Sequence, residues 1–200
     1  MLLGCFGPRV VTSASTGDEG LFRALDGTEA VDRKALARLF FGAAATLEGG
    51  KTSVRLLQSV VSGGESSQQA IRDMMSSRFH NYDRASARFQ SAVSRLLDRP
   101  ASDVYLYSTL NAGHYVCLQL DGFTRLAETY GASTRDMLSV LSSMEGCELF
   151  RRAAFHPRVG ALIEEALAGG ADGAELRELR EELRAMEELL EDLHEIDRGE

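Results

Sequence analysis

A short stretch, Gly50-Lys51-Thr52-Ser53, resembles the end of a phosphate-binding loop. Such a loop has a glycine five residues before the Gly-Lys pair, so that backbone amides can surround a phosphate after a strand. Here that position is Ala45, and the residues before it are spaced as in a helix. We therefore interpret the glycines as the end of one helix and Ser53 as the start of the next, and we expect no nucleotide site.

His114 and Cys117 are one helical turn apart in a long apolar segment. A structural zinc site needs four ligands, and a nucleophilic cysteine needs a base with an orienting partner. Cys5, Cys117 and Cys147 show no repeated spacing, which favours neither a zinc array nor a disulfide framework and suits a reducing compartment. We expect no catalytic residues, no metal and no cofactor, and an intracellular protein that is cytoplasmic by default.

Cys5 lies in a small apolar N-terminal segment and is a candidate for S-acylation. One acyl chain gives only reversible membrane contact, so Cys5 suggests peripheral attachment, and the alternative is a segment packed into the core. Position 2 is Leu2, whereas N-myristoylation needs glycine there. The longest nearly uninterrupted apolar run, residues 39–47, is too short to span a bilayer, and no secretory signal is visible.

The net charge of −8 is confined to one segment of the chain. Residues 172–200 contain twelve acidic side chains and four arginines, while the other 171 residues contain 18 acidic and 18 basic side chains. Binding to a nucleic-acid backbone needs a basic surface. A neutral body with an acidic end therefore argues against nucleic acid as the partner.

Glycines and helix-capping residues divide the chain into helices, and no strand pattern of useful length appears. The stretch from 66 to 98 is periodic throughout, with Ser66 and Gln69 as a capping box, and it forms either one helix or two that break near His80-Asn81. Ser102 and Ser133 are expected to cap the two helices that follow. The expected helices are residues 18–25, 36–47, 53–61, 66–98, 102–130, 133–144, a short one around 149–150, and 157–167.

Apolar residues lie on nearly every side of the segment 104–130, which is typical of a helix in the middle of a core. We predict an all-α protein, a bundle of about seven helices around this central helix, followed by a long charged amphipathic helix. The expected organisation is an irregular N-terminal segment at 1–17, the bundle at 18–168 and an acidic C-terminal helix at 172–198.

The C-terminal helix has the clearest contact surface in the sequence. Asp172 and Glu175 form a capping box after the glycines at 169–170. Apolar residues then alternate spacings of three and four, the a/d register of a coiled coil, for three heptads. The residues of this apolar stripe are Leu176, Leu179, Leu183, Met186, Leu190 and Leu193.

Two interpretations of the stripe stay open. It contacts a protein partner or a second copy of the chain, or it packs back onto the body. The acidic excess would make a parallel homodimer repel itself, which leaves a basic partner or antiparallel packing. We therefore expect a non-enzymatic interaction or scaffold protein acting through its C-terminal helix. The alternative function is a bundle whose hydrophobic groove binds a peptide helix or a small ligand.

Overall fold

The structure is a computed structural model, and every regular element in its described part is a helix. It describes residues 21–22, 33–63, 68–144 and 146–154, together with 161, 164, 168, 173–174, 177, 180–181 and 184. The all-α class is confirmed for these residues. Five helices are defined there: α2 Arg33–Ser62, α3 Gln69–Asp98, α4 Asp103–Thr129, α5 Thr134–Met144 and α6 Cys147–Ala154. The expected number of about seven is not confirmed, since two of the expected helices lie largely outside the described residues.

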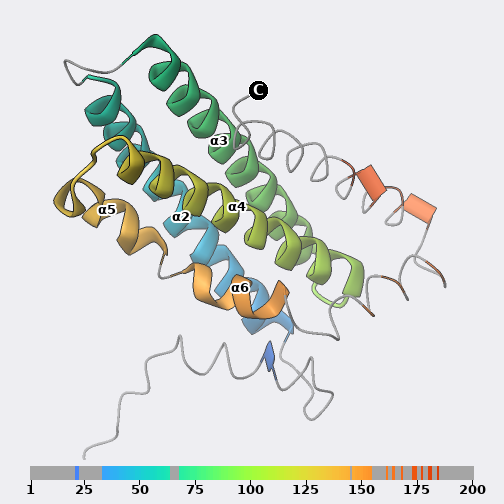
Figure 1. Ribbon diagram of the computed structural model, residues 1–200. Coiled ribbons are helices and arrows are strands. Elements are labelled where there is room, and N and C mark those ends of the chain that lie inside the picture. The colour runs from blue at the N-terminus through green and yellow to red at the C-terminus, as the bar shows by residue number, and fades with distance from the viewer. Residues whose placement is uncertain are drawn as a thin grey trace, which may run out of the picture.

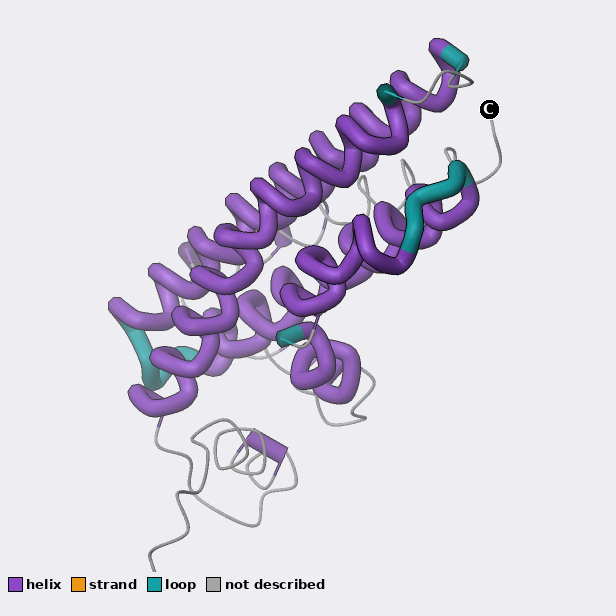
Figure 2. Tube along the Cα trace, turned by 90° about the vertical axis from the view of Figure 1, so that its left-hand side faces the viewer, coloured by secondary structure: helices purple, strands orange, loops and turns teal. Residues whose placement is uncertain are grey.

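Three long helices, α2, α3 and α4, lie side by side and alternate in direction (Figure 1). Figure 2 shows the same lengthwise packing from the side. The shorter α5 packs against α2, and α6 packs against α4. Helix α4 contacts each of the other four helices, which explains why its sequence is apolar on nearly all sides. None of the described helices combines the length and the apolar composition needed to cross a membrane.

Helix α2 runs without a break through Gly49 and Gly50, so the expected helix end there is wrong. Gly50 is buried where α2 meets α5 and α3: a Cβ at this position would lie 2.7 Å from the Ser143 Oγ and 3.4 Å from the Tyr82 hydroxyl. A glycine inside a helix is thus explained by a close approach of neighbours, and not by a chain reversal.

Helix α3 is one helix, which resolves the choice left open by the sequence. Its N-cap is Gln68, whose side chain makes no capping hydrogen bond. The capping box predicted from Ser66 and Gln69 is therefore wrong, because Gln69 is the first helical residue rather than the third. Asn81, at the suspected break, is buried inside the helix. Burial of one face holds the helix together across this polar position.

Local capping chemistry fixes both ends of α4 and the start of α5, as expected. The Ser102 Oγ accepts a hydrogen bond from the backbone N–H of Tyr105, 3.2 Å away. Gly131 follows α4 with a φ of 90°, a conformation that suits glycine. At α5, the Ser133 N–H donates to the Asp136 Oδ2 over 3.0 Å, and the Asp136 N–H donates to the Ser133 Oγ over 3.3 Å. The Ser133 hydroxyl also donates to the Asp136 Oδ2 over 2.6 Å, and this bond, together with the one from the Ser133 N–H, lowers the pKa of Asp136.

Several expected elements fall wholly or largely outside the described residues: the irregular segment 1–17, the helices at 18–25 and 157–167, and most of 172–198. Of the last segment, residues 173–174, 177, 180–181 and 184 are described. They are helical and exposed to solvent.

Candidate functional site

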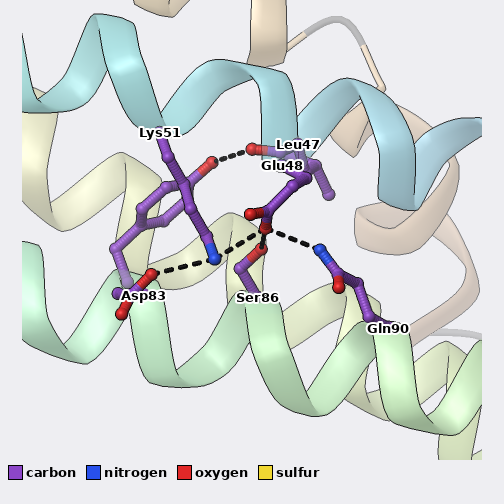
Figure 3. Close-up of polar contacts among 7 residues, drawn as sticks. Leu47, Glu48, Lys51, Asp83, Ser86 and Gln90 are labelled. Carbon is purple, nitrogen blue, oxygen red and sulfur yellow. Dashed lines mark hydrogen bonds and ion pairs between the residues drawn. The ribbon is translucent and has the colours of Figure 1, made fainter.

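Helices α2 and α3 share a cluster of polar side chains centred on Glu48 (Figure 3). The Lys51 Nζ lies 2.6 Å from the Glu48 Oε2 and 2.8 Å from the Asp83 Oδ1. The same Glu48 oxygen accepts hydrogen bonds from the Ser86 Oγ over 3.1 Å and from the Gln90 Nε2 over 2.6 Å. One carboxylate oxygen of α2 is therefore held by three polar groups, two of them on α3.

The electrostatics of this cluster favour a charged Lys51 and a neutral Tyr82. Burial lowers the pKa of Lys51, but its hydrogen bonds to Asp83 and Glu48 and their charges together raise it above the ordinary value. Beside it, the buried Tyr82 hydroxyl donates to the Leu47 carbonyl oxygen over 2.7 Å. Burial, followed by the negative charges of Glu48 and Asp83, raises the pKa of Tyr82 far above its usual range. Neither group is poised to exchange a proton near neutral pH, so the cluster joins two helices.

The phosphate-loop resemblance is explained by this geometry. Residues 50–53 lie inside α2, where backbone N–H groups bond to the preceding turn instead of curling around an anion. Lys51 is already shared between Glu48 and Asp83. A nucleotide site at this position is therefore excluded by the local backbone.

Cys117 of α4 and Cys147 of α6 form a disulfide with a Cα–Cα distance of 5.5 Å. Both residues are fully buried. The expectation that the cysteines form no disulfide is therefore wrong for this pair. Their separation of 30 residues in the sequence did not indicate that they pair, because the bond depends on α6 folding back onto α4. Because of this bond, Cys117 is not a free nucleophile. The cysteines also no longer indicate a reducing compartment, since two of the three are paired.

Charged groups flank the disulfide on both helices. The Arg151 Nη2 of α6 lies 2.5 Å from the Asp121 Oδ1 of α4. His114 is half-buried nearby on α4. Burial lowers the pKa of His114, the charge of Arg151 lowers it further, and Asp121 only partly opposes them. His114 is thus neutral at pH 7, and with Cys117 oxidised the pair lacks the nucleophile that thiol chemistry requires.

The lowered pKa of His114 predicts an acid-sensitive stability. Below about pH 6.5, the ordinary pKa of histidine, the unfolded chain binds a proton at His114 that the folded chain does not, so stability falls as the pH is lowered towards the folded pKa. His114→Asn is expected to remove this part of the pH dependence between pH 7 and pH 5, measured from urea midpoints. His80→Asn, at an exposed position, is the control and should retain it. Identical pH profiles for the two variants would contradict the assignment.

Sequence reasoning missed a set of buried polar residues on α3 and α4. Arg78, Asn81 and Gln119 are nearly or fully buried. The amide oxygen and nitrogen of Gln119 make no hydrogen bond, a cost of about 1–3 kcal/mol for a buried polar group. Helical periodicity assigns polar residues to the surface, so no sequence signal identified these three. Nothing among the described residues explains Gln119.

The residues predicted to contact a partner, Leu176, Leu179, Leu183, Met186, Leu190 and Leu193, all lie outside the described residues, as does Cys5. Large apolar side chains are exposed elsewhere on the surface. Among them are Leu56 (62%) and Val60 (44%) on α2, and Leu138 (59%) and Leu141 (37%) on α5. Since α2 packs against α5, these four residues belong to neighbouring helices.

Comparison with known proteins leaves the chain without a family assignment. A scan against protein-family models, a search of curated proteins and a search of solved structures each find no match to it. Among the described residues, no group of three or more histidine, cysteine or acidic side chains is arranged to hold a metal ion. Any functional argument therefore rests on the residues themselves.

Proposed function

We propose that this chain is a non-enzymatic interaction or scaffold protein that contacts a protein partner, or a second copy of itself, through residues 172–198. The observation that carries the proposal is the apolar stripe in that segment, which repeats with the a/d register over three heptads. Three heptads form a surface long enough for helix packing and lie at the lower limit for a coiled coil.

The described residues of the segment support an amphipathic helix. In the register of the stripe, Arg177 and Arg184 take position b, Arg180 takes position e and Glu181 takes position f. These positions lie off the stripe, and all four residues are helical and exposed. An amphipathic helix would expose these residues while its apolar side packs against something else.

The polar groups of the described body support a structural rather than a catalytic role. Lys51 is bound by two carboxylates, and Cys117 is bonded to Cys147. An acid, base or nucleophile needs a pKa near the working pH and access to substrate. Lys51 and Cys117 meet neither condition, which is why we favour interaction over catalysis.

Co-purification of the full chain tests the proposal. The double variant Leu183→Gln and Leu190→Gln keeps the net charge and a good helix former while removing apolar surface from the stripe. We expect it to lose the associated proteins, or the self-association, of the parent chain. The matched control, Glu181→Gln with Arg184→Gln, also keeps the net charge and changes exposed positions off the stripe. If both double variants retain the same partners, the stripe is not the contact.

A second candidate function rests on the exposed apolar residues of α2 and α5. Leu56 and Val60 are one turn apart on α2, and Leu138 and Leu141 are one turn apart on α5. Such a pair of apolar rows on adjacent helices suits a peptide helix laid between them. This function predicts that Leu56→Gln with Leu138→Gln abolishes binding while the stripe variant does not, so the same co-purification separates the two.

An intracellular location is part of the proposal, with Cys5 as a point of peripheral membrane contact if it is acylated. The Cys117–Cys147 disulfide is the observation against it, because structural disulfides are rare in reducing compartments. Fractionation of cells, with and without Cys5→Ser, measures both the compartment and the membrane contact.

A further inference from the structure

Four arginines follow one another along a single face of α3 and its C-terminal end: Arg84, Arg88, Arg95 and Arg99. Their spacings of four, seven and four residues turn successive members by no more than about 40° around the helix. From first to last they span about 22 Å at 1.5 Å per residue. We call these four residues the arginine row.

The row lies on a different face of α3 from the side that binds α2. Tyr82, Ser86 and Gln90 all bond to α2, and they lie about a third of a turn or more from the row. Within the described part of the chain, neither Arg84 nor Arg88 forms an ion pair, and Arg84 is exposed.

Arg95 and the aspartates of α3 determine the charge around the arginine row. The Arg95 guanidinium lies over the Tyr105 ring of α4, 6.0 Å from its centroid. Of the aspartates on α3, Asp83 pairs with Lys51 and Asp73 accepts a hydrogen bond from Gln69. Asp98 is the last residue of the helix. The row is therefore a local concentration of positive charge on a body that is neutral as a whole.

The chain carries a segment of matching charge. Residues 172–200 hold twelve acidic side chains and four arginines. In the heptad register, Glu175 and Glu182 take g positions and Glu187 takes an e position, directly beside the apolar stripe. A helix that lays this stripe on the body would bring carboxylates to its edges, where arginine guanidinium groups bind them well.

We propose that the arginine row receives residues 172–198 of the same chain, as a latch that a partner must displace. The inference rests on the proposed function, because the partner would use the same apolar stripe. The 17 residues between 154 and 172 would reach about 60 Å if fully extended, compared with about 45 Å for the length of α3. Residues 161, 164 and 168 among them are helical, so the reach of this tether is shorter than that upper limit. A tether of this length keeps the segment at a high effective concentration near the row, which favours it over a second copy.

Hydrogen exchange of the full chain, followed by mass spectrometry, tests the latch. We expect residues 172–198 to be protected, and Arg84→Glu with Arg88→Glu to speed their exchange at least tenfold. Adding Glu182→Arg and Glu187→Arg to that variant should restore protection, which a merely misfolded protein would not show. The control, Arg38→Glu with Arg135→Glu, makes the same charge change at exposed positions on α2 and α5 and should leave exchange unchanged.

Three outcomes overturn the latch. The first is that Arg84→Glu with Arg88→Glu leaves the exchange of residues 172–198 unchanged, and the second is that the control variant speeds this exchange equally. The third is that protection of residues 172–198 rises with protein concentration, because the segment then docks on a second copy of the chain. Failure of the latch and failure of the proposed function are distinguishable. If the row variant has no effect but Leu183→Gln with Leu190→Gln still loses its partners, the proposed function stands without the latch. If the latch is present, the row variant should capture more partner than the parent chain.

Discussion

Replacing Phe150 by alanine is expected to lower the free energy of unfolding by about 3–5 kcal/mol, the range for truncating a buried phenylalanine. Phe150 is fully buried on α6. Its ring centroid lies 5.1 Å from that of Phe89 on α3, in an edge-on arrangement, and 5.7 Å from that of Phe40 on α2. Its ring also lies against Gly113 of α4, so one side chain of α6 contacts all three long helices. Urea unfolding followed by circular dichroism measures the loss.

Phe41→Ala is the matched control for this prediction. Phe41 follows Phe40 on α2 but is 59% exposed. Its truncation should change stability by no more than about 0.5 kcal/mol, as is usual for surface substitutions. Equal losses for the two variants would show that α6 does not pack into the core as described.

Glycine-to-alanine substitutions inside two helices are expected to change the free energy of unfolding in opposite directions. At Gly113 of α4, a Cβ would lie 2.5 Å from the Phe150 Cδ1 and 3.0 Å from its Cγ, so Gly113→Ala forces the ring to move and costs about 1–3 kcal/mol. At Gly49 of α2, a Cβ meets nothing within 4 Å. Gly49→Ala should therefore stabilise by up to about 1 kcal/mol, the helix-propensity difference. The urea midpoint of each variant, compared with that of the parent chain, shows whether the substitution stabilises or destabilises the fold.

Gly50→Ala gives an intermediate case. The nearest atom to its Cβ is the Ser143 Oγ at 2.7 Å, the end of a side chain that can rotate away. We expect its stability to fall between those of the other two variants. A stabilising Gly113→Ala would mean that Phe150 does not pack against α4 at this point.

Local chemistry made part of this fold predictable. Ser102 and Ser133 cap the helices that the sequence assigns to them, because a serine hydroxyl meets the free N–H groups of a first turn wherever the helix lies. Gly131 ends α4 through its positive φ, again a local property. The all-α class follows from many such signals and from the apolar periodicity.

Features that depend on distant residues were not predictable. Gly49 and Gly50 have the composition of a helix end, yet Gly50 is placed by Ser143, 93 positions further along the chain. The disulfide joins Cys117 to Cys147 only because α6 returns to α4. Likewise, the role of Lys51 depends on Asp83, which α3 brings alongside α2. In each case packing between helices overrides what the local sequence indicates.

The central claim is that the apolar side of residues 172–198 is a contact surface, and photo-cross-linking measures this directly. A photoreactive amino acid replaces either Leu190, on the stripe, or Arg184, which is exposed and lies off it. We expect cross-linked products from position 190, to a partner or to the arginine row, and few from position 184. Equal yields from the two positions, or none from position 190, would contradict the claim.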